Sequence, residues 1–231
     1  MSVEPAPAID WAVEHRRARQ RIDELVAGGS AADGSRVVEV CPEWTVHDVV
    51  AHVVSLASAL SAGDLPRGDI QEWIDGLVED RRSTPFLSLT DEWDERSDAI
   101  DAFVAGMGTG GATLVYDAVA HEHDLRLALG RPGARDSSGV AACAAAASQL
   151  LAGDLGRLGL PAVRITSAGR TWDVGAGEPQ LEIELDPFEL IRVFGSRRSE
   201  RQLRALPWRG DLDRYLPAIC HLPLPDHDID E

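Results

Sequence analysis

The sequence contains no lysine, so all 22 of its basic residues are arginines, against 39 aspartates and glutamates. The resulting net charge of −17 repels nucleic-acid backbones and anionic lipid head groups. Aromatic residues are also scarce, at 5% of the chain, whereas hydrophobic residues make up 44%. We therefore expect a chain that buries a substantial core and has neither nucleic acid nor a membrane surface as a partner.

Cysteines are few as well, and no two of them form a C-x-x-C pair. Cys41, Cys143 and Cys220 are widely spaced, which argues against a disulfide framework and against a cysteine zinc knuckle. The first residues lack the basic and apolar regions of a secretory signal. The alanine-rich run over 139–153 is shorter than a membrane span. These features predict a reduced, cytoplasmic protein.

Apolar residues at helical spacing dominate the first two thirds of the chain. The spacing predicts helices over 9–26, 45–62, 70–78, 89–107, 112–129 and 139–158. Thr45 and Asp48 have the spacing of a capping box, and Gly130 followed by Pro132 is typical of a helix end. Several helices with short connections predict an antiparallel four-helix bundle.

The pattern changes near residue 160 to an alternation with period two. Strands are expected over 162–166, 171–174 and 180–185, followed by helices over 187–194 and 200–206. The fold class is therefore mainly α with a small α+β part. We place the bundle and a connecting helix at 1–158, a small C-terminal α/β domain at 159–222, and an acidic disordered tail at 223–231.

One group of polar residues stands out on the predicted bundle helices. Asp117 and His121 are four residues apart, so their side chains lie on one helix face. Asp124 falls in the same sector, whereas His123 points to nearly the opposite side and is expected to be exposed. His52 lies at the edge of the valine stripe of the second helix. If the two helices are neighbours, His52, Asp117 and His121 converge inside the bundle.

Three nitrogen and oxygen donors on two helices match a catalytic zinc site, which keeps a fourth position for water or substrate. Nickel, iron and manganese accept the same donors, so the sequence does not select the metal. The spacing alone favours the alternative, a hydrogen-bonded Asp–His pair with a half-buried His52 beside it, because D-x-x-x-H is a common pattern.

Two motifs around these residues resemble a known family. Residues 41–52 read C-P-E-W-T-V-H-D-V-V-A-H, and residues 117–125 read D-A-V-A-H-E-H-D-L. They are similar to the two signatures of the mycothiol-dependent maleylpyruvate isomerase family, which belongs to the DinB-like group of metal-binding four-helix bundles. Further similarity lies in a glycine turn at 175–179, a Gly-Ser-Arg-Arg segment within 194–199, and W-x-G-D at 208–211.

This resemblance implies a divalent metal, zinc first, held by His52, Asp117 and His121, with Asp124 supporting His121. It also implies mycothiol as the thiol cofactor. A metal-bound thiol loses its proton and becomes a nucleophile, so the expected activity is that of a maleylpyruvate isomerase or a thiol S-transferase. Two positions depart from the family pattern: Asp117 stands where a glutamate is usual, and Glu43 where a glycine is usual.

An anionic substrate needs a positive partner in a protein this acidic. Arg126, Arg197 and Arg198 are the candidates, because a guanidinium binds a carboxylate through two hydrogen bonds. A simple surface arginine is the alternative for each of them. Cys41 has nothing basic beside it in the sequence and is expected to be a buried loop thiol.

Two further functions remain open at this point. The first is a non-catalytic module that binds a metal or a small ligand, which the shorter Asp117 favours. The second is a regulatory protein that meets a partner through the acidic face of residues 91–98. The expected partners of the enzyme are a small-molecule substrate and a low-molecular-weight thiol, and we expect a monomer or a homodimer. The composition, rich in alanine and arginine, fits a GC-rich bacterial genome.

Overall fold

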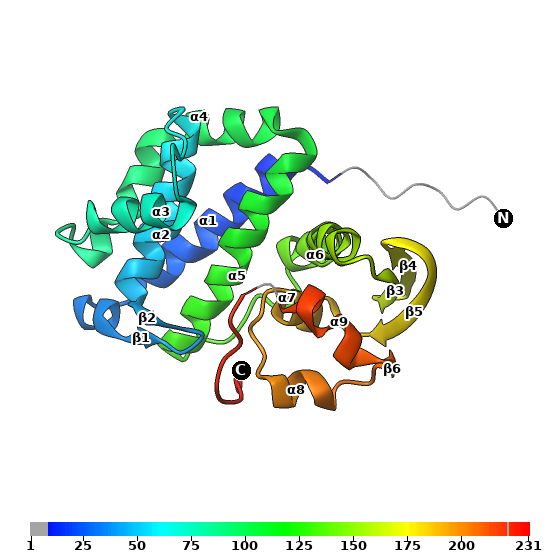
Figure 1. Ribbon diagram of the computed structural model, residues 1–231. Helices are drawn as coiled ribbons and strands as arrows, with labels where there is room; N and C mark the ends of the chain where they lie inside the picture. Colours follow the sequence, from blue (N-terminus) through cyan, green and yellow to red (C-terminus); the bar gives the residue numbers. More distant parts are fainter. Residues whose placement is uncertain (1–8, 221) are drawn as a thin grey trace.

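The computed structural model describes residues 9–220 and 222–231, without the side chains of residues 148–150. Four long helices form a bundle, and a shorter one, α3, packs against α2 (Figure 1). The helices of this part are α1 (Trp11–Ala27), α2 (Val46–Ser61), α3 (Ile70–Glu79), α4 (Asp91–Gly106) and α5 (Gly111–Leu129). The single turns of 3-10 helix lie at Ala31–Ser35, Phe86–Ser88 and Gly108–Gly110. The predicted helical bundle is confirmed.

Local signals in the sequence fix where these helices begin and end. The side chain of Thr45 accepts a hydrogen bond from the backbone N–H of Asp48, and the Asp48 carboxylate accepts one from the N–H of Thr45 at 2.9 Å. This capping box starts α2 one turn and a half before His52. Gly130 ends α5 with a φ of 63°, a conformation that glycine adopts without strain.

A short ribbon of two strands precedes α2 and is absent from the sequence-based prediction. Strand β1 (Val37–Val38) pairs antiparallel with β2 (Cys41–Thr45). The ribbon is too short for a visible alternation of apolar and polar residues, and Pro42 lies inside it. It places Trp44 and Cys41 beside the first turns of α2.

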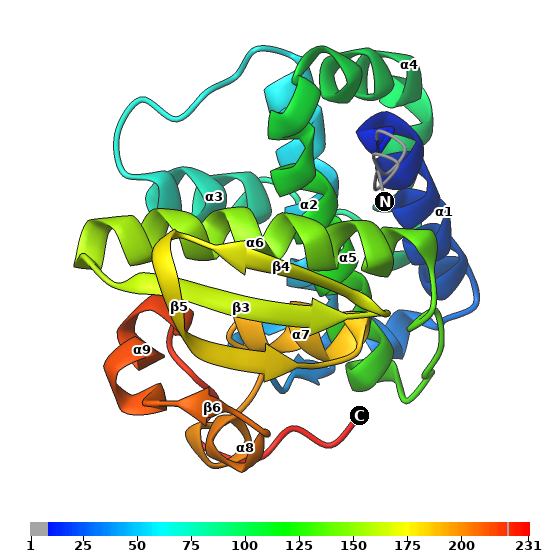
Figure 2. The same ribbon diagram turned by 90° about the vertical axis from the view of Figure 1, so that its right-hand side faces the viewer.

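The C-terminal part is a four-stranded sheet with helices around it (Figure 2). Its strands lie in the order β4 (Arg170–Val174), β3 (Pro161–Ser167), β5 (Ala176–Glu184) and β6 (Arg209–Gly210). Strand β3 is antiparallel to β4 and parallel to β5, and β6 is antiparallel to β5. The helices of this part are α6 (Ser138–Leu158), α7 (Pro187–Phe194), α8 (Glu200–Ala205) and α9 (Leu212–Ile219).

The alternation along the strands separates a buried from an exposed sheet face. Val163 pairs with Leu181 and Ile165 with Ile183, and all four side chains lie in one core with α6 and α7. The W-x-G-D segment supplies strand β6 next to this core. Gly210 has a φ of 124° there, and a Cβ atom on it would overlap the carbonyl oxygen of Gln180, so only glycine fits this close approach.

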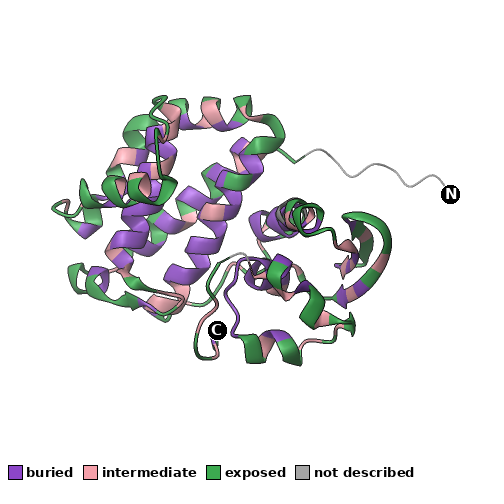
Figure 3. Ribbon diagram, in the orientation of Figure 1, coloured by how far each residue is buried: buried purple, intermediate pink, exposed green. Residues whose placement is uncertain are grey.

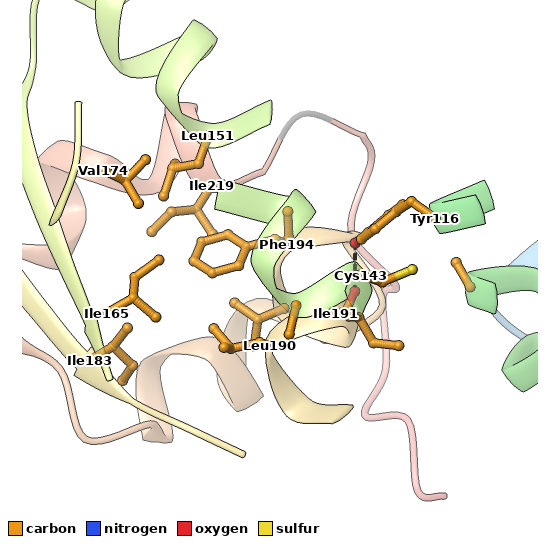
Figure 4. Packing of buried hydrophobic residues seen from close by; sticks show 14 of the residues in the cluster. Tyr116, Cys143, Leu151, Ile165, Val174, Ile183, Leu190, Ile191, Phe194 and Ile219 are labelled. Carbon is orange, nitrogen blue, oxygen red and sulfur yellow. Dashed lines mark hydrogen bonds between the residues drawn. The ribbon is translucent and has the colours of Figure 1, made fainter. Parts of the chain in front are cut away.

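Helix α5 contributes to both hydrophobic cores of the molecule. Leu114 and Leu125 pack inside the bundle, whereas Val115 and Tyr116 pack into the core of the C-terminal part. The hydroxyl of Tyr116 donates a hydrogen bond of 2.8 Å to the carbonyl oxygen of Ile191 in α7 (Figure 4). Like α2, α5 is buried along most of its length (Figure 3).

Helix α6 begins one residue before the predicted helix over 139–158, and it is longer than the alanine-rich run over 139–153. Its 21 residues are enough, by length and composition, to cross a membrane, and 60% of that stretch is buried inside the molecule. Its packing on α5 and α7 gives it the environment of a core helix. The boundary at residue 158 stays a prediction, because α6 joins the core of the sheet as well as the bundle.

Residues 222–231 differ from the disordered tail that the sequence predicts. They run back between α8 and the end of α5 (Figure 1). Ile229 is 2% exposed, and its backbone N–H and C=O bind the side-chain amide of Gln202 at 3.0 and 2.8 Å. Asp228 and Glu231 of this segment pair with arginines that are distant in the sequence, and composition alone does not reveal such pairs.

Candidate metal centre

Helices α2 and α5 bring His52, Asp117 and His121 together inside the bundle. One ligand atom from each residue lies within 4.8 Å of the other two. Asp117 Oδ1 is 3.3 Å from Nε2 of His52 and 3.7 Å from Nε2 of His121. The three residues that the spacing singles out therefore converge, and Asp117 reaches both rings despite its shorter side chain.

The donor set fits a divalent metal ion. In a tetrahedral zinc site with bonds of about 2.0–2.1 Å, neighbouring ligand atoms are roughly 3.3–3.4 Å apart, close to the two distances to Asp117. The side chains of His52 and His121 are 6% and 8% exposed, whereas that of Asp117 is 28% exposed. The cluster is therefore closed on the histidine side and open to solvent beside the carboxylate.

The histidines also set the charge state of Asp117. Burial on its own raises the pKa of this carboxyl group, but the neighbouring His52 and His121 lower it more, to about 2. Asp117 is thus an ionised oxygen donor at neutral pH.

Two residues of β2, Trp44 and Cys41, lie against the cluster. The role of Trp44 beside the histidines could not be predicted from its residue type alone. The ring of Trp44 lies 5.0 Å from that of His52 and 6.2 Å from that of His121, between centroids. Cys41, which is half-buried, has its sulfur within 4.8 Å of ligand atoms of His121 and Asp124. Burial raises the pKa of the Cys41 thiol to about 11, and the Asp124 carboxylate adds to this shift, so the thiol stays protonated at neutral pH.

Asp124 lies behind His121, on the side away from Asp117. Its Oδ2 is 3.0 Å from His121 Nδ1, and the carboxylate binds Arg192 at 2.7 Å and Arg197 at 3.0 Å. Burial raises the pKa of Asp124, but Arg197 and Arg192 hold it well below its usual range. A carboxylate at this distance favours the ring orientation in which Nε2 of His121 faces Asp117.

The three candidate arginines occupy different environments. Arg197 contacts Asp124 and so lies next to the cluster. Arg198 turns the other way and pairs with Glu189 at 2.7 Å and Glu231 at 2.6 Å. Arg126 pairs with Glu122 at 2.9 Å on another face of α5. Of the three, the structure brings Arg197 to the candidate metal centre.

Sequence reasoning missed Arg192, which is fully buried and binds Asp124. One signal was available: a single arginine inside the apolar run from Leu190 to Phe194. A charge in such a run must be paired, and the partner is a carboxylate on another helix.

His123 is 2% exposed, so the expectation that it lies on the surface is wrong. It does point away from His52 and Asp117, but the C-terminal part covers that side of α5. The ring packs edge-on against Phe188 of α7, with 4.8 Å between centroids. Helical periodicity predicts the direction of a side chain and not what covers it.

Fold and cluster together define a four-helix bundle with a His–Asp–His centre, extended by a small α/β part. Residues 15–126 match the family model described as the mycothiol maleylpyruvate isomerase N-terminal domain. This match confirms the resemblance that the two signatures carry. The match covers the bundle through most of α5 and stops before the α/β part.

Solved structures extend the likeness in fold to the C-terminal part. A mycothiol-dependent maleylpyruvate isomerase shares 10% sequence identity with this chain at a TM-score of 0.57, over 82% of this chain and 89% of its own. A histidine-to-alanine mutant of a mycothiol-dependent maleylpyruvate isomerase shares 11% identity at a TM-score of 0.55, over 79% and 86%. A comparison with curated proteins gives no match.

Proposed function

We propose that this protein is a metal-dependent enzyme that uses mycothiol, with maleylpyruvate isomerase or thiol S-transferase activity. The observation that carries the proposal is the convergence of His52, Asp117 and His121 within 4.8 Å. The match of the bundle to the family model supports the choice of thiol and of reaction class. His52 Nε2, Asp117 Oδ1 and His121 Nε2 are the proposed metal ligands.

A bound divalent cation would hold the thiol sulfur and lower its pKa, which makes it a nucleophile at neutral pH. The side chains around the cluster prepare this position. Asp124 keeps His121 turned with Nε2 toward Asp117. Trp44 covers the two histidine rings and excludes water from their side. The exposed side of Asp117 leaves an approach for thiol and substrate.

Arg197 is the proposed positive partner of an anionic substrate. It is held in place because it donates to Asp124 at 3.0 Å and to the carbonyl oxygen of Gly195 at 2.6 Å. Its charge also lowers the pKa of Asp117, after the larger effects of burial and the two histidines. Arg126 and Arg198, the other two candidates from the sequence, are bound by carboxylates away from the cluster.

Metal analysis of the purified protein tests the ligand set. We expect about one zinc or other divalent ion per chain, lost in His52→Ala and His121→Ala. His227→Ala is the matched control, because this exposed histidine pairs with Glu39 and Asp226 and with none of the three proposed ligands. Equal metal content in all four proteins would refute the assignment.

A thiol titration of the cobalt-substituted protein separates an enzyme from a binding module. An open site takes the thiol as a further ligand, and the visible spectrum of the cobalt ion changes. A closed, structural metal site leaves that spectrum unchanged, which would favour the non-catalytic module. Turnover of maleylpyruvate, or of an electrophile with mycothiol, then distinguishes isomerase from transferase.

A further inference from the structure

Behind the candidate metal centre lies a row of buried charges, of which the proposed function uses only the two nearest to it, Arg197 and Asp124. Three arginines and three carboxylates alternate along it, so their formal charges cancel. In order they are Arg197, Asp124, Arg192, Glu231, Arg198 and Glu189, joined by ion pairs of 3.0, 2.7, 2.7, 2.6 and 2.7 Å.

The middle of this row is shielded from water. The side chains of Arg192 and Asp124 are both 0% exposed, and that of Glu231 is 6% exposed. Charges at such sites interact strongly and keep their geometry only while every member is paired. One end of the row meets the proposed metal ligand His121 through Asp124.

The position of Glu231 in the row depends on the contacts that hold residues 228–231 in place. Asp228 accepts a hydrogen bond from Ser199 at 2.6 Å, and Ile229 is bound on both sides by Gln202. These contacts place the Glu231 carboxylate between the guanidinium groups of Arg192 and Arg198. Glu231 therefore connects this segment, through Arg192, to the Asp124 carboxylate beside His121.

We propose that Glu231 and Arg192 are positioning residues that hold Asp124 against His121, so that the docking of residues 228–231 sets the affinity of the metal site. This inference rests on the proposed function for the identity of the ligands. Loss of the Glu231 charge leaves three arginines facing two carboxylates. The excess positive charge repels a divalent cation and frees Arg192 to move, and both effects weaken metal binding.

The test compares Glu231→Gln with Asp230→Asn, which removes the same charge from an exposed neighbour. Zinc affinity is measured by competition with a chromophoric chelator. Partners of a ligand histidine change metal affinity by about 10–100-fold. Glu231 lies two ion pairs beyond Asp124, the partner of His121, so we expect E231Q to weaken zinc binding by about three- to tenfold. D230N should stay within about twofold, because exposed charges are screened by salt.

A second measurement needs no metal. The NMR signals of the His121 ring are recorded in the metal-free protein, where E231Q and Arg192→Lys should shift them and D230N should not. Ring signals and zinc affinity that change equally in E231Q and D230N, or in neither, overturn the proposal. If the unmodified protein binds no zinc while the ring signals respond to E231Q alone, the positioning role stands and the proposed metal chemistry fails.

Discussion

Asp124→Asn is the substitution that this structure predicts to be most costly in the site. Asp124 Oδ1 accepts from Arg192, and Oδ2 accepts from Arg197 and lies 3.0 Å from His121 Nδ1. An asparagine has one oxygen and one NH₂ group in these places, and the NH₂ group cannot accept a hydrogen bond. In either orientation one buried guanidinium loses its hydrogen bond to residue 124, and both lose the negative charge beside them.

The size of the effect follows from the burial of the ion pairs. Removing one partner of a buried pair costs about 3–5 kcal/mol, a large part of the roughly 5–15 kcal/mol that holds a typical protein folded. With a urea m-value of about 3 kcal/mol/M, the unfolding midpoint should fall by roughly 1–1.7 M. Urea unfolding followed by circular dichroism measures this change.

Asp173→Asn is the matched control for this prediction. Asp173 also accepts two hydrogen bonds from one arginine, Arg164, at 2.8 and 2.9 Å, but both side chains are about 40% exposed. Exposed pairs contribute little to stability, so the midpoint of D173N should stay close to that of the unmodified protein. A D124N midpoint that moves no further than that of D173N would refute the reasoning.

Three further predictions concern folding and pH. Gly195→Ala places a Cβ atom 2.9 Å from the Tyr116 hydroxyl and should cost about 1–3 kcal/mol by overpacking; an unchanged melting temperature would contradict this. Burial, then the charge of Arg19, lowers the pKa of His15 from 6.5 to about 4, so the neutral ring contributes stability that is complete above pH 6.5 and is lost as the pH falls toward 4. His15→Gln should reduce the loss of unfolding free energy between neutral and acidic pH by about 3 kcal/mol. Urea unfolding at pH 7 and pH 4.5 measures that loss, which should be smaller in the variant than in the unmodified protein. Ala168 has a φ of 48° in the β3–β4 turn, so Ala168→Asn should raise stability by about 1 kcal/mol; a lower melting temperature would count against a strained turn.

Much of the fold could be predicted because its signals are local. Helix α7 begins and ends at the predicted residues, since Pro187 suits the first turn and Gly195 follows the last apolar residue. Strands β3 and β5 could be predicted from their alternation, and β4 from its position between glycines. Strand β6 and helix α9 could not be predicted. Strand β6 forms only through its pairing with β5, at a glycine whose lack of a Cβ atom leaves room for the carbonyl oxygen of Gln180.

The candidate site also has features that local signals predict and features that depend on the packing of distant parts of the chain. Asp117 and His121 could be predicted to share a helix face, and His52 to lie at the edge of the valine stripe of α2, because helical periodicity fixes both. The arginine that lies near these residues could not be predicted, because its position depends on how the C-terminal part packs on α5. Arg197 and Arg198 are adjacent in the sequence yet pair with Asp124 and Glu189 respectively, and no pattern in the sequence separates them.

The position of α5 in two cores bears on how such a chain can be divided or recombined. The family match ends at residue 126, within this helix, and α5 uses Tyr116 and its neighbours to fill a core that lies outside the match. A bundle cut from the chain at that point would expose apolar side chains and leave Asp124 without Arg192 and Arg197. The matched region is thus a unit of homology that is not a unit of folding. A chimera that exchanges C-terminal parts between relatives must carry over the facing side of α5 together with the arginines that pair with it.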